Sequence, residues 1–148
     1  MPTVLIIEDN PVSAVVLSQI LQRSYNVVST LDPEEAKGYC RDLKIDVIVA
    51  DVLLGTPVSG TEIARALRQS CPDIPVLFVS GTPLEGWFAS DFANIEALLP
   101  GRVDFLMKPF TAEALTVAVS RLLQHDYSDT DIRAAVAEAK SFRKTAGS

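Results

Sequence analysis

The chain has 148 residues, of which 48% are apolar and 22% charged, a composition that suits one folded domain and excludes a disordered chain. The formal net charge of −6 lies wholly in residues 1–124, since the rest of the chain has four acids and four bases, so no basic stripe is present to bind nucleic acid. No apolar run approaches the roughly 20 residues of a membrane span, no basic leader precedes Glu8, and we expect a cytoplasmic protein that does not contact a membrane.

Apolar runs and helical patterns alternate five times along the chain. The runs predict strands at residues 3–7, 26–29, 46–50, 76–79 and 103–107. Helices are predicted to begin after Asn10, at Asp32, at Gly60 and after Thr111, where capping residues, prolines or acids precede an apolar stripe. Strands that alternate with helices form right-handed βαβ units. The sequence therefore predicts an α/β fold with a five-stranded, parallel, doubly wound sheet and helices on both faces.

Each predicted helix has apolar residues at helical spacing. The first is expected to run toward Arg23 with an apolar set of Val12, Val15, Val16, Ile20 and Leu21. The third and fifth have the apolar sets Ile63, Ala64, Leu67 and Leu115, Val119, Leu122, Leu123. These stripes are expected to pack against the sheet.

Two segments are additional to, or longer than, what a minimal five-stranded fold of this kind needs. The segment between Ser80 and Lys108 is long for one helix, and its aromatic residues are either ordinary core or a partner site: Trp87, Phe88 and Phe92. The tail at residues 125–148 predicts an amphipathic helix, capped by Ser128 or Asp129, with an apolar side of Ile132, Ala135, Val136, Ala139 and Phe142. We expect this helical extension to pack on the domain formed by residues 1–124, and we predict no separate output domain.

Three acids and one lysine follow strands of the predicted sheet. Glu8 and Asp9 follow the first strand, Asp51 follows the third, and Lys108 follows the fifth. Ligand sites of open α/β sheets lie at the carboxyl ends of the strands, so these side chains are expected at one edge. Carboxylates this close repel by about 1 kcal/mol per pair in water and by several-fold more in a shielded pocket. Mg²⁺ would compensate that repulsion, although any one of the acids alone is consistent with a solvated strand end.

These positions resemble the receiver domain of two-component response regulators, over about residues 3–123. The match consists of Glu8-Asp9, Asp51, Ser80 and Lys108-Pro109, in the family's order and at the same strand ends. The resemblance implies a flavodoxin-like fold and a phosphorylation-controlled signalling switch rather than an enzyme. It also implies that the phosphoryl donor is a histidine kinase or a histidine phosphotransfer protein.

The resemblance implies a role for each side chain that handles the phosphoryl group. Asp51 accepts it from a phosphohistidine, Lys108 pairs with its oxygens, and the peptide before Pro109 is cis. The Ser80 hydroxyl donates to the phosphoryl group, and Phe105 is the aromatic residue whose rotamer follows that movement. Taken alone, Ser80 is equally consistent with a turn residue, and Phe105 with plain core.

The metal site is also implied by the resemblance. Asp9 and Asp51 would bind Mg²⁺ directly, with the backbone carbonyl of Leu53 as a third ligand. Glu8 would act mainly through water. The loop after Asp51 departs from the family pattern at Gly55-Thr56-Pro57, and the apolar Leu53 is expected to crowd the path of hydrolytic water. We therefore predict slow loss of the phosphoryl group.

Two other functions compete with a switch. A Mg²⁺-dependent phosphatase of the haloacid-dehalogenase type needs a second acid two residues after its nucleophile, and that position is Leu53. A phosphorylation-independent interaction scaffold would be expected to have lost part of the site. The output of a switch would pass to an effector protein or a homodimer through the face of the fourth helix, fifth strand and fifth helix. A stand-alone regulator and a receiver of a hybrid kinase are both consistent with the sequence.

Three remaining residues are not assigned to the site. Cys40 and Cys71 have no metal-ligand spacing and are expected to be ordinary reduced residues. His125, the sole histidine, is expected to be a helix C-terminal cation or simply exposed, and not catalytic.

Overall fold

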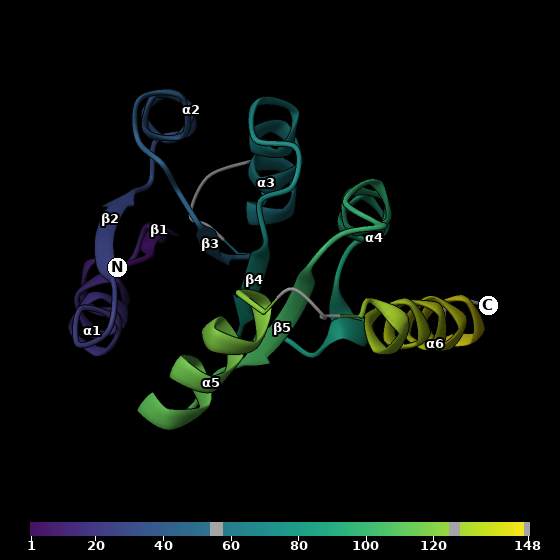
Figure 1. Cartoon of the computed structure of the whole chain (residues 1–148). Coiled ribbons are helices and arrows are strands. Elements are labelled where there is room, and N and C mark those ends of the chain that lie inside the picture. Colours follow the sequence, from purple (N-terminus) through teal and green to yellow (C-terminus); the bar gives the residue numbers. More distant parts are fainter. Residues whose placement is uncertain (54–57, 125–127, 147–148) are drawn as a thin grey trace.

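The structure is a computed structural model that describes residues 1–53, 58–124 and 128–146 (Figure 1). Its sheet has the order β2-β1-β3-β4-β5, and all neighbouring strands are parallel. The strands are β1 (Thr3–Ile7), β2 (Asn26–Thr30), β3 (Val47–Asp51), β4 (Val76–Ser80) and β5 (Val103–Met107). The predicted five-stranded, parallel, doubly wound sheet is confirmed, with strand limits shifted by one residue at β2, β3 and β4.

The helix starts that the sequence predicted are confirmed, and no start was predicted for α4. They are α1 (Pro11–Leu21), α2 (Pro33–Asp42), α3 (Gly60–Ser70), α4 (Ala89–Ala97), α5 (Ala112–Leu122) and α6 (Thr130–Ala146), with a short 3₁₀ turn η1 (Leu84–Gly86). The side chains of Asn10, Asp32, Ser59 and Thr111 each accept a hydrogen bond from a backbone N–H of the first turn that follows. Helix α1 ends at Leu21 rather than Arg23.

Each face of the sheet has its own apolar core, because successive side chains of a strand point to opposite faces. Val4 and Ile6 of β1 pack with α1 and α5, whereas Leu5 and Ile7 pack with residues of α2, α3, α4 and α6. Figure 1 shows α1 and α5 on one side of the sheet and α2, α3 and α4 on the other. The predicted helices on both faces are therefore present.

The apolar stripe predicted for α1 is correct for Ile20 and Leu21, which pack in the core, and wrong for its three valines. Val12, Val15 and Val16 are exposed, and the residues that α1 buries are Leu17 and Leu21. Helix α1 is apolar on more than one face, so the sequence does not determine which face is buried. The rotation of the helix about its axis, set by tertiary packing, decides it. The exposed valines lie in the first half of α1, which begins at Pro11, soon after β1 ends at Ile7.

The long segment between β4 and β5 forms η1 and α4. Trp87 and Phe92 are buried in the core, so for them the core interpretation is correct. Phe88, in contrast, is 60% exposed. The peptide between Lys108 and Pro109 is cis as expected, and the peptide between Leu99 and Pro100, which was not predicted, is also cis.

The tail helix α6 lies against η1 and α4 (Figure 1). Its residues Ile132, Val136 and Ala139 are buried in the same core as the adjoining face of the sheet. Phe142 was predicted on this apolar side, yet it is 60% exposed. Two predictions concern residues outside those that the structure describes. They are the departure from the family pattern at residues 55–57 and the expectation that His125 is a helix C-terminal cation or exposed.

The two cysteines are free thiols, as expected. Cys40 is buried and Cys71 half-buried, and the Cys71 thiol donates a hydrogen bond to the Cys40 carbonyl. Burial, with a smaller effect of Cys71, raises the pKa of Cys40 to about 12. Within the described ranges, no helix combines the length and apolar character required to cross a membrane.

Candidate functional site

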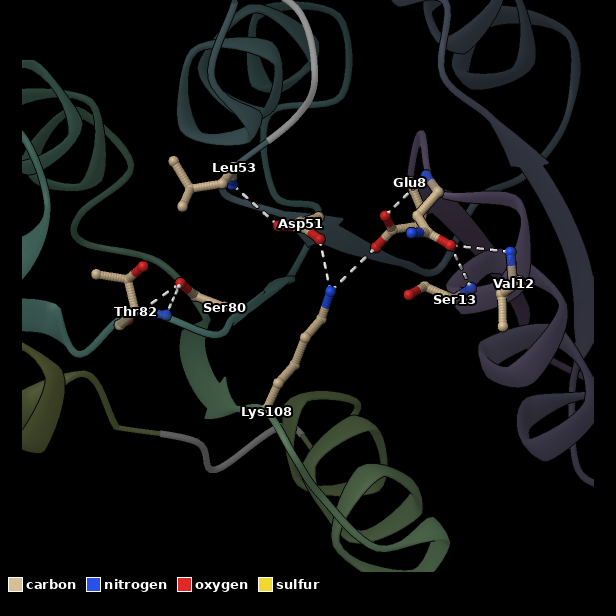
Figure 2. A network of polar contacts seen from close by, with 9 residues as sticks. Glu8, Val12, Ser13, Asp51, Leu53, Ser80, Thr82 and Lys108 are labelled. Carbon is tan, nitrogen blue, oxygen red and sulfur yellow. Dashed lines mark hydrogen bonds and ion pairs between the residues drawn. The ribbon is translucent and has the colours of Figure 1, made fainter.

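The carboxyl ends of four strands bring the predicted residues to one edge of the sheet. Glu8 follows β1, Asp51 and Ser80 are the last residues of β3 and β4, and Lys108 follows β5. Since these strands are neighbours in the order β1-β3-β4-β5, residues far apart in sequence lie close together. Figure 2 shows Asp51 between Glu8 on one side and Ser80 on the other, with the Lys108 side chain reaching toward the two acids.

Lys108 joins two buried carboxylates. Its Nζ lies 2.6 Å from Oδ2 of Asp51 and 3.5 Å from Oε2 of Glu8. Asp51 and Glu8 are only 6% and 5% exposed, so solvent screens these ion pairs weakly. Burial acts to lower the pKa of Lys108, but the hydrogen bonds and charges of Asp51 and Glu8 outweigh it and raise that pKa. Lys108 is therefore held as a cation at the centre of the site.

Glu8 is a buried carboxyl that contacts the carboxyl of Asp51. Burial, followed by contact with the Asp51 carboxyl, raises the pKa of Glu8 to about 7. The backbone N–H of Asn10 donates to Glu8 Oε1 at 3.1 Å and opposes that rise. Loss of hydration is thus the main reason that the pKa of Glu8 is raised, and the neighbouring carboxyl adds to it.

Asp51 is oriented by the backbone on its other oxygen. The N–H of Leu53 donates to Asp51 Oδ1 at 2.9 Å, while Oδ2 meets Lys108. The Leu53 side chain is exposed beside the site. Both oxygens of Asp51 thus have a fixed donor, and the carboxylate is presented in one orientation.

Gly60 permits the tight packing behind Asp51, which the sequence did not indicate. A Cβ on Gly60 would lie 1.9 Å from the backbone oxygen of Asp51, so only glycine fits. Its N–H donates to the carbonyl of Val52 at 3.1 Å. The adjacent Ser59 caps α3. The Ser59-Gly60-Thr61-Glu62 pattern is a capping-box signal that could have identified Ser59 as the cap.

A buried acid on α4 links this region to α3 and was also missed. Asp91 Oδ1 accepts hydrogen bonds from the hydroxyls of Ser59 at 2.6 Å and Thr61 at 2.5 Å. Its Oδ2 accepts from the N–H of Phe88 at 3.3 Å. The periodicity of α4 shows no sign of this contact, because the partners are about 30 residues away in sequence.

Ser80 is engaged in a local turn. Its hydroxyl donates to the carbonyl of Thr82 at 3.0 Å and accepts from the N–H of Thr82 at 3.0 Å (Figure 2). The turn interpretation of Ser80 therefore describes this structure. Its predicted donation to a phosphoryl group stays a prediction, because it requires the hydroxyl to leave Thr82.

Phe105 is part of an aromatic cluster at the β5 side of the site. Its ring stacks on Phe78 with centroids 6.2 Å apart and meets the edge of Trp87 at 5.2 Å. Trp87 Nε1 donates to the carbonyl of Thr82 at 3.0 Å, the same oxygen that accepts from Ser80. The predicted switch aromatic thus packs against Trp87, which shares the Thr82 carbonyl with Ser80.

The acidic side chains at this edge are the residues that could hold a metal ion. In residues 1–53, 58–124 and 128–146, no group of three or more acidic, cysteine or histidine side chains is arranged to hold an ion. Glu8 and Asp51 are brought together, and Asp9 is half-buried directly after Glu8. All are hard oxygen donors, and the charge of Asp51 adds to the burial that raises the pKa of Glu8. The chemistry of these residues therefore fits Mg²⁺.

Comparison with known proteins agrees with this geometry. The family model of the response regulator receiver domain matches residues 4–120. The probable transcriptional regulatory protein TcrX of Mycobacterium tuberculosis is 31% identical over 82% of this chain and 50% of its own length. The hybrid signal transduction histidine kinase D of Dictyostelium discoideum is 31% identical over 82% of this chain and 8% of its own. The chain spans half or less of the length of these relatives.

Solved structures share the fold. The chemotaxis protein CheY4 of Vibrio cholerae superposes with a TM-score of 0.70 at 25% identity, covering 83% of this chain and 99% of that chain. The signal receiver domain of an HD domain-containing protein from Pseudomonas fluorescens has a TM-score of 0.71 at 20% identity, with coverages of 84% and 95%. The similarity to the Pseudomonas fluorescens domain shows a shared fold and nothing more.

Proposed function

This chain belongs to the response regulator receiver domain family of two-component signalling, and we propose that it is a switch that accepts a phosphoryl group on Asp51. One observation carries the proposal. A buried carboxylate at the end of β3 lies 2.6 Å from a lysine ammonium at the end of β5. Phosphoryl transfer relies on positioning and on neutralising charge, and this pair supplies both.

The proposed step is a single displacement at phosphorus. An oxygen of Asp51 attacks the phosphorus of a donor phosphohistidine, the new P–O bond forms, the P–N bond breaks, and the histidine keeps the electron pair. Lys108 neutralises the charge on the phosphoryl oxygens, and the Leu53 N–H holds the carboxylate in its orientation. The phosphorylated side chain gains roughly −1.5 to −2 charges, which is what the rest of the molecule then senses.

Mg²⁺ is the proposed cofactor. Asp9 and Asp51 would hold it, together with the backbone carbonyl of Leu53, and Glu8 would act through water. When bound, the ion would neutralise the phosphoryl oxygens and orient the donor. The raised pKa of Glu8 supports this proposal, because a cation at this edge would relieve the repulsion between Glu8 and Asp51.

The proposed phosphoryl donor is a histidine kinase or a histidine phosphotransfer protein. Two relatives support it by their names: the hybrid histidine kinase D and the sensor kinase CckA of Brucella abortus, which is 30% identical over 82% of this chain. The exposed Val12, Val15 and Val16 of α1 begin just after Glu8 and Asp9. An apolar patch beside the acceptor is a suitable contact for the donor protein.

The proposed output is contact with an effector protein or a second copy of the chain through α4, β5 and α5. Direct binding to nucleic acid is not proposed, because the net charge of −6 opposes it. A switch is preferred to a phosphatase because position 53 is leucine and provides no general acid. It is preferred to a phosphorylation-independent scaffold because Lys108 and Asp51 are still paired.

The test is direct phosphorylation of the full chain. Incubation with acetyl phosphate and Mg²⁺ should add the mass of one phosphoryl group to the intact protein, and omission of Mg²⁺ should prevent it. Asp51→Asn should abolish the gain, whereas Asp46→Asn, a carboxylate at the opposite end of β3 that accepts from the Thr3 N–H, should not. A wild-type chain that gains no mass, or gains it equally in Asp51→Asn, contradicts the proposal.

A further inference from the structure

Helix α6 covers an apolar face built by α4 and η1. Its residues Ile132, Val136 and Ala139 fall at helical spacing on one side and are buried in the same core as Trp87 and Phe92. An ion pair between Lys140 Nζ and Glu96 Oε1, 2.5 Å apart, ties α6 to α4. The family match ends at residue 120, before α6 begins, so this helix lies outside the region that defines the family.

Open grooves lie beside the contact between α6 and the domain. A groove of about 580 Å³ lies along α4 and α6 and is lined by Glu96, Leu99, Arg133, Val136, Ala137 and Lys140. A second groove, of about 490 Å³, lies between η1 and α6, where Phe142 is largely exposed. The ion pair to Glu96 is half-exposed, so it stabilises the contact weakly. The contact between α6 and the domain thus includes three buried side chains and one half-exposed ion pair, with open grooves beside it.

A short chain of contacts connects this seat to the phosphoacceptor site. The carbonyl of Thr82 accepts from the Ser80 hydroxyl and from Trp87 Nε1, each at 3.0 Å. Trp87 directly follows η1, and its N–H donates to the carbonyl of Leu84 at 3.1 Å. Since η1 packs on α6, a continuous line of contacts runs from Ser80 through Thr82, Trp87 and η1 to α6.

We propose that α6 is a detachable intramolecular ligand of the α4–η1 face, and that a phosphoryl group on Asp51 releases it through Ser80, Thr82 and Trp87. This inference rests on the proposed function for its trigger. When the Ser80 hydroxyl turns to the phosphoryl group, the Thr82 carbonyl loses one donor and the Thr82 N–H loses its acceptor. The turn from Ser80 to Thr82, whose carbonyl holds the Trp87 indole, is then no longer closed by hydrogen bonds. The α4–η1 surface on which α6 packs changes shape as a result. Release of α6 opens an apolar surface next to an acid, Glu96.

The experiment measures α6 and Trp87 in the full chain. Hydrogen exchange followed by mass spectrometry reports the protection of α6, and Trp87 is the single tryptophan, so its emission reports the seat itself. After beryllofluoride and Mg²⁺, we expect α6 amides to exchange about tenfold faster and the Trp87 emission to shift to the red. Asp51→Asn should show neither change. Modification of Asp51 is measured separately by the acetyl phosphate mass gain.

Two variants test the connection without any phosphoryl group. Ser80→Ala removes the donor to Thr82, and Lys140→Glu places two acids together at the α4 contact. Both should speed α6 exchange and shift the Trp87 emission in the untreated chain. Lys37→Glu is the matched control, since it reverses an exposed ion pair on α2 with Glu34 and should move neither signal.

The outcomes separate the two proposals. A mass gain without any change in α6 exchange overturns α6 release and leaves the phosphoacceptor function intact. If no mass is gained, the proposed function fails. The α6 exchange rates of the untreated Ser80→Ala and Lys140→Glu variants then show whether α6 can detach from α4 and η1. Joint movement of α6 exchange and Trp87 emission in Ser80→Ala supports the connection, whereas an unchanged α6 in that variant overturns it.

Discussion

Lys108 Nζ lies 2.6 Å from Asp51 Oδ2, although the two residues are 57 positions apart in the chain. The contact exists because β3 and β5 lie on either side of β4 and end at the same edge of the sheet. It leaves Glu8 as a second acid at 3.5 Å from the same ammonium, so the site holds two buried carboxylates for one lysine. Stability, pH dependence and reactivity should all depend on this imbalance.

Replacement of Lys108 by Met should destabilise the protein, because it leaves two buried carboxylates without a cation. We expect the free energy of unfolding in urea to fall by about 2 kcal/mol, since Lys108 is partly exposed and solvent moderates the loss. In an Asp51→Asn background the same change should cost much less. Equal losses in both backgrounds would show that the ion pair contributes nothing.

The stability of the metal-free protein should fall as the pH rises toward neutral. The pKa of Glu8 is about 7 in the folded chain against an ordinary value of 4.5, so the folded state holds a proton that the unfolded state releases. That stabilisation is complete below pH 4.5 and is lost as the pH rises through 7. Thermal unfolding between pH 5 and 8 measures it.

Two comparisons isolate Glu8 in that experiment. Glu8→Gln should flatten the pH profile, and Glu35→Gln, at an exposed position in the first turn of α2, should leave it unchanged. Mg²⁺ should raise the unfolding temperature more at pH 7.5 than at pH 5.5, because the ion and the proton compete for the same acidic edge. A Glu8→Gln profile identical to wild type would assign the pH dependence to another group.

Replacement of Leu53 by Asn should accelerate loss of the phosphoryl group. The Leu53 side chain is exposed beside Asp51, where a polar side chain can hold a water in line with the P–O bond. A tenfold faster hydrolysis corresponds to about 1.4 kcal/mol in the barrier. The decay of the phosphorylated mass with time gives the rate. Leu43→Asn, at an exposed position next to α2, is the control, and a wild-type half-life of seconds would contradict the role given to Leu53.

Gly60→Ala should be among the most damaging single-methyl additions in this protein. The added Cβ would lie 1.9 Å from the Asp51 carbonyl oxygen, so either β3 or α3 must move. We expect a loss of about 3 kcal/mol in unfolding free energy and slower phosphorylation. Gly38→Ala, within α2 and without a close contact, should stabilise the protein by up to about 1 kcal/mol. Urea denaturation of both variants makes the comparison.

Much of the fold follows from local sequence patterns. The limits of β1 and β5 were predicted to the residue: an apolar run in each, at residues 4–7 and 105–107, is followed directly by a charged residue. Asn10, Asp32 and Thr111 mark helix starts by hydrogen bonds made within four residues of each cap. The family resemblance is confirmed by the match over residues 4–120, because the order of residues at the strand ends identifies it without coordinates.

The sequence by itself thus determined the α/β class, the edge of the sheet at which Glu8, Asp51 and Lys108 gather, and the family. These depend on the period of the strands and on the rule that parallel strands end together. Only the tertiary structure decided that α1 buries Leu17 rather than Val16, that Ser80 is held by Thr82, and that α6 seats on α4 and η1. Helix rotation, hydroxyl partners and docking are set by contacts between distant segments, and a linear pattern contains no information on which of several equivalent contacts is made.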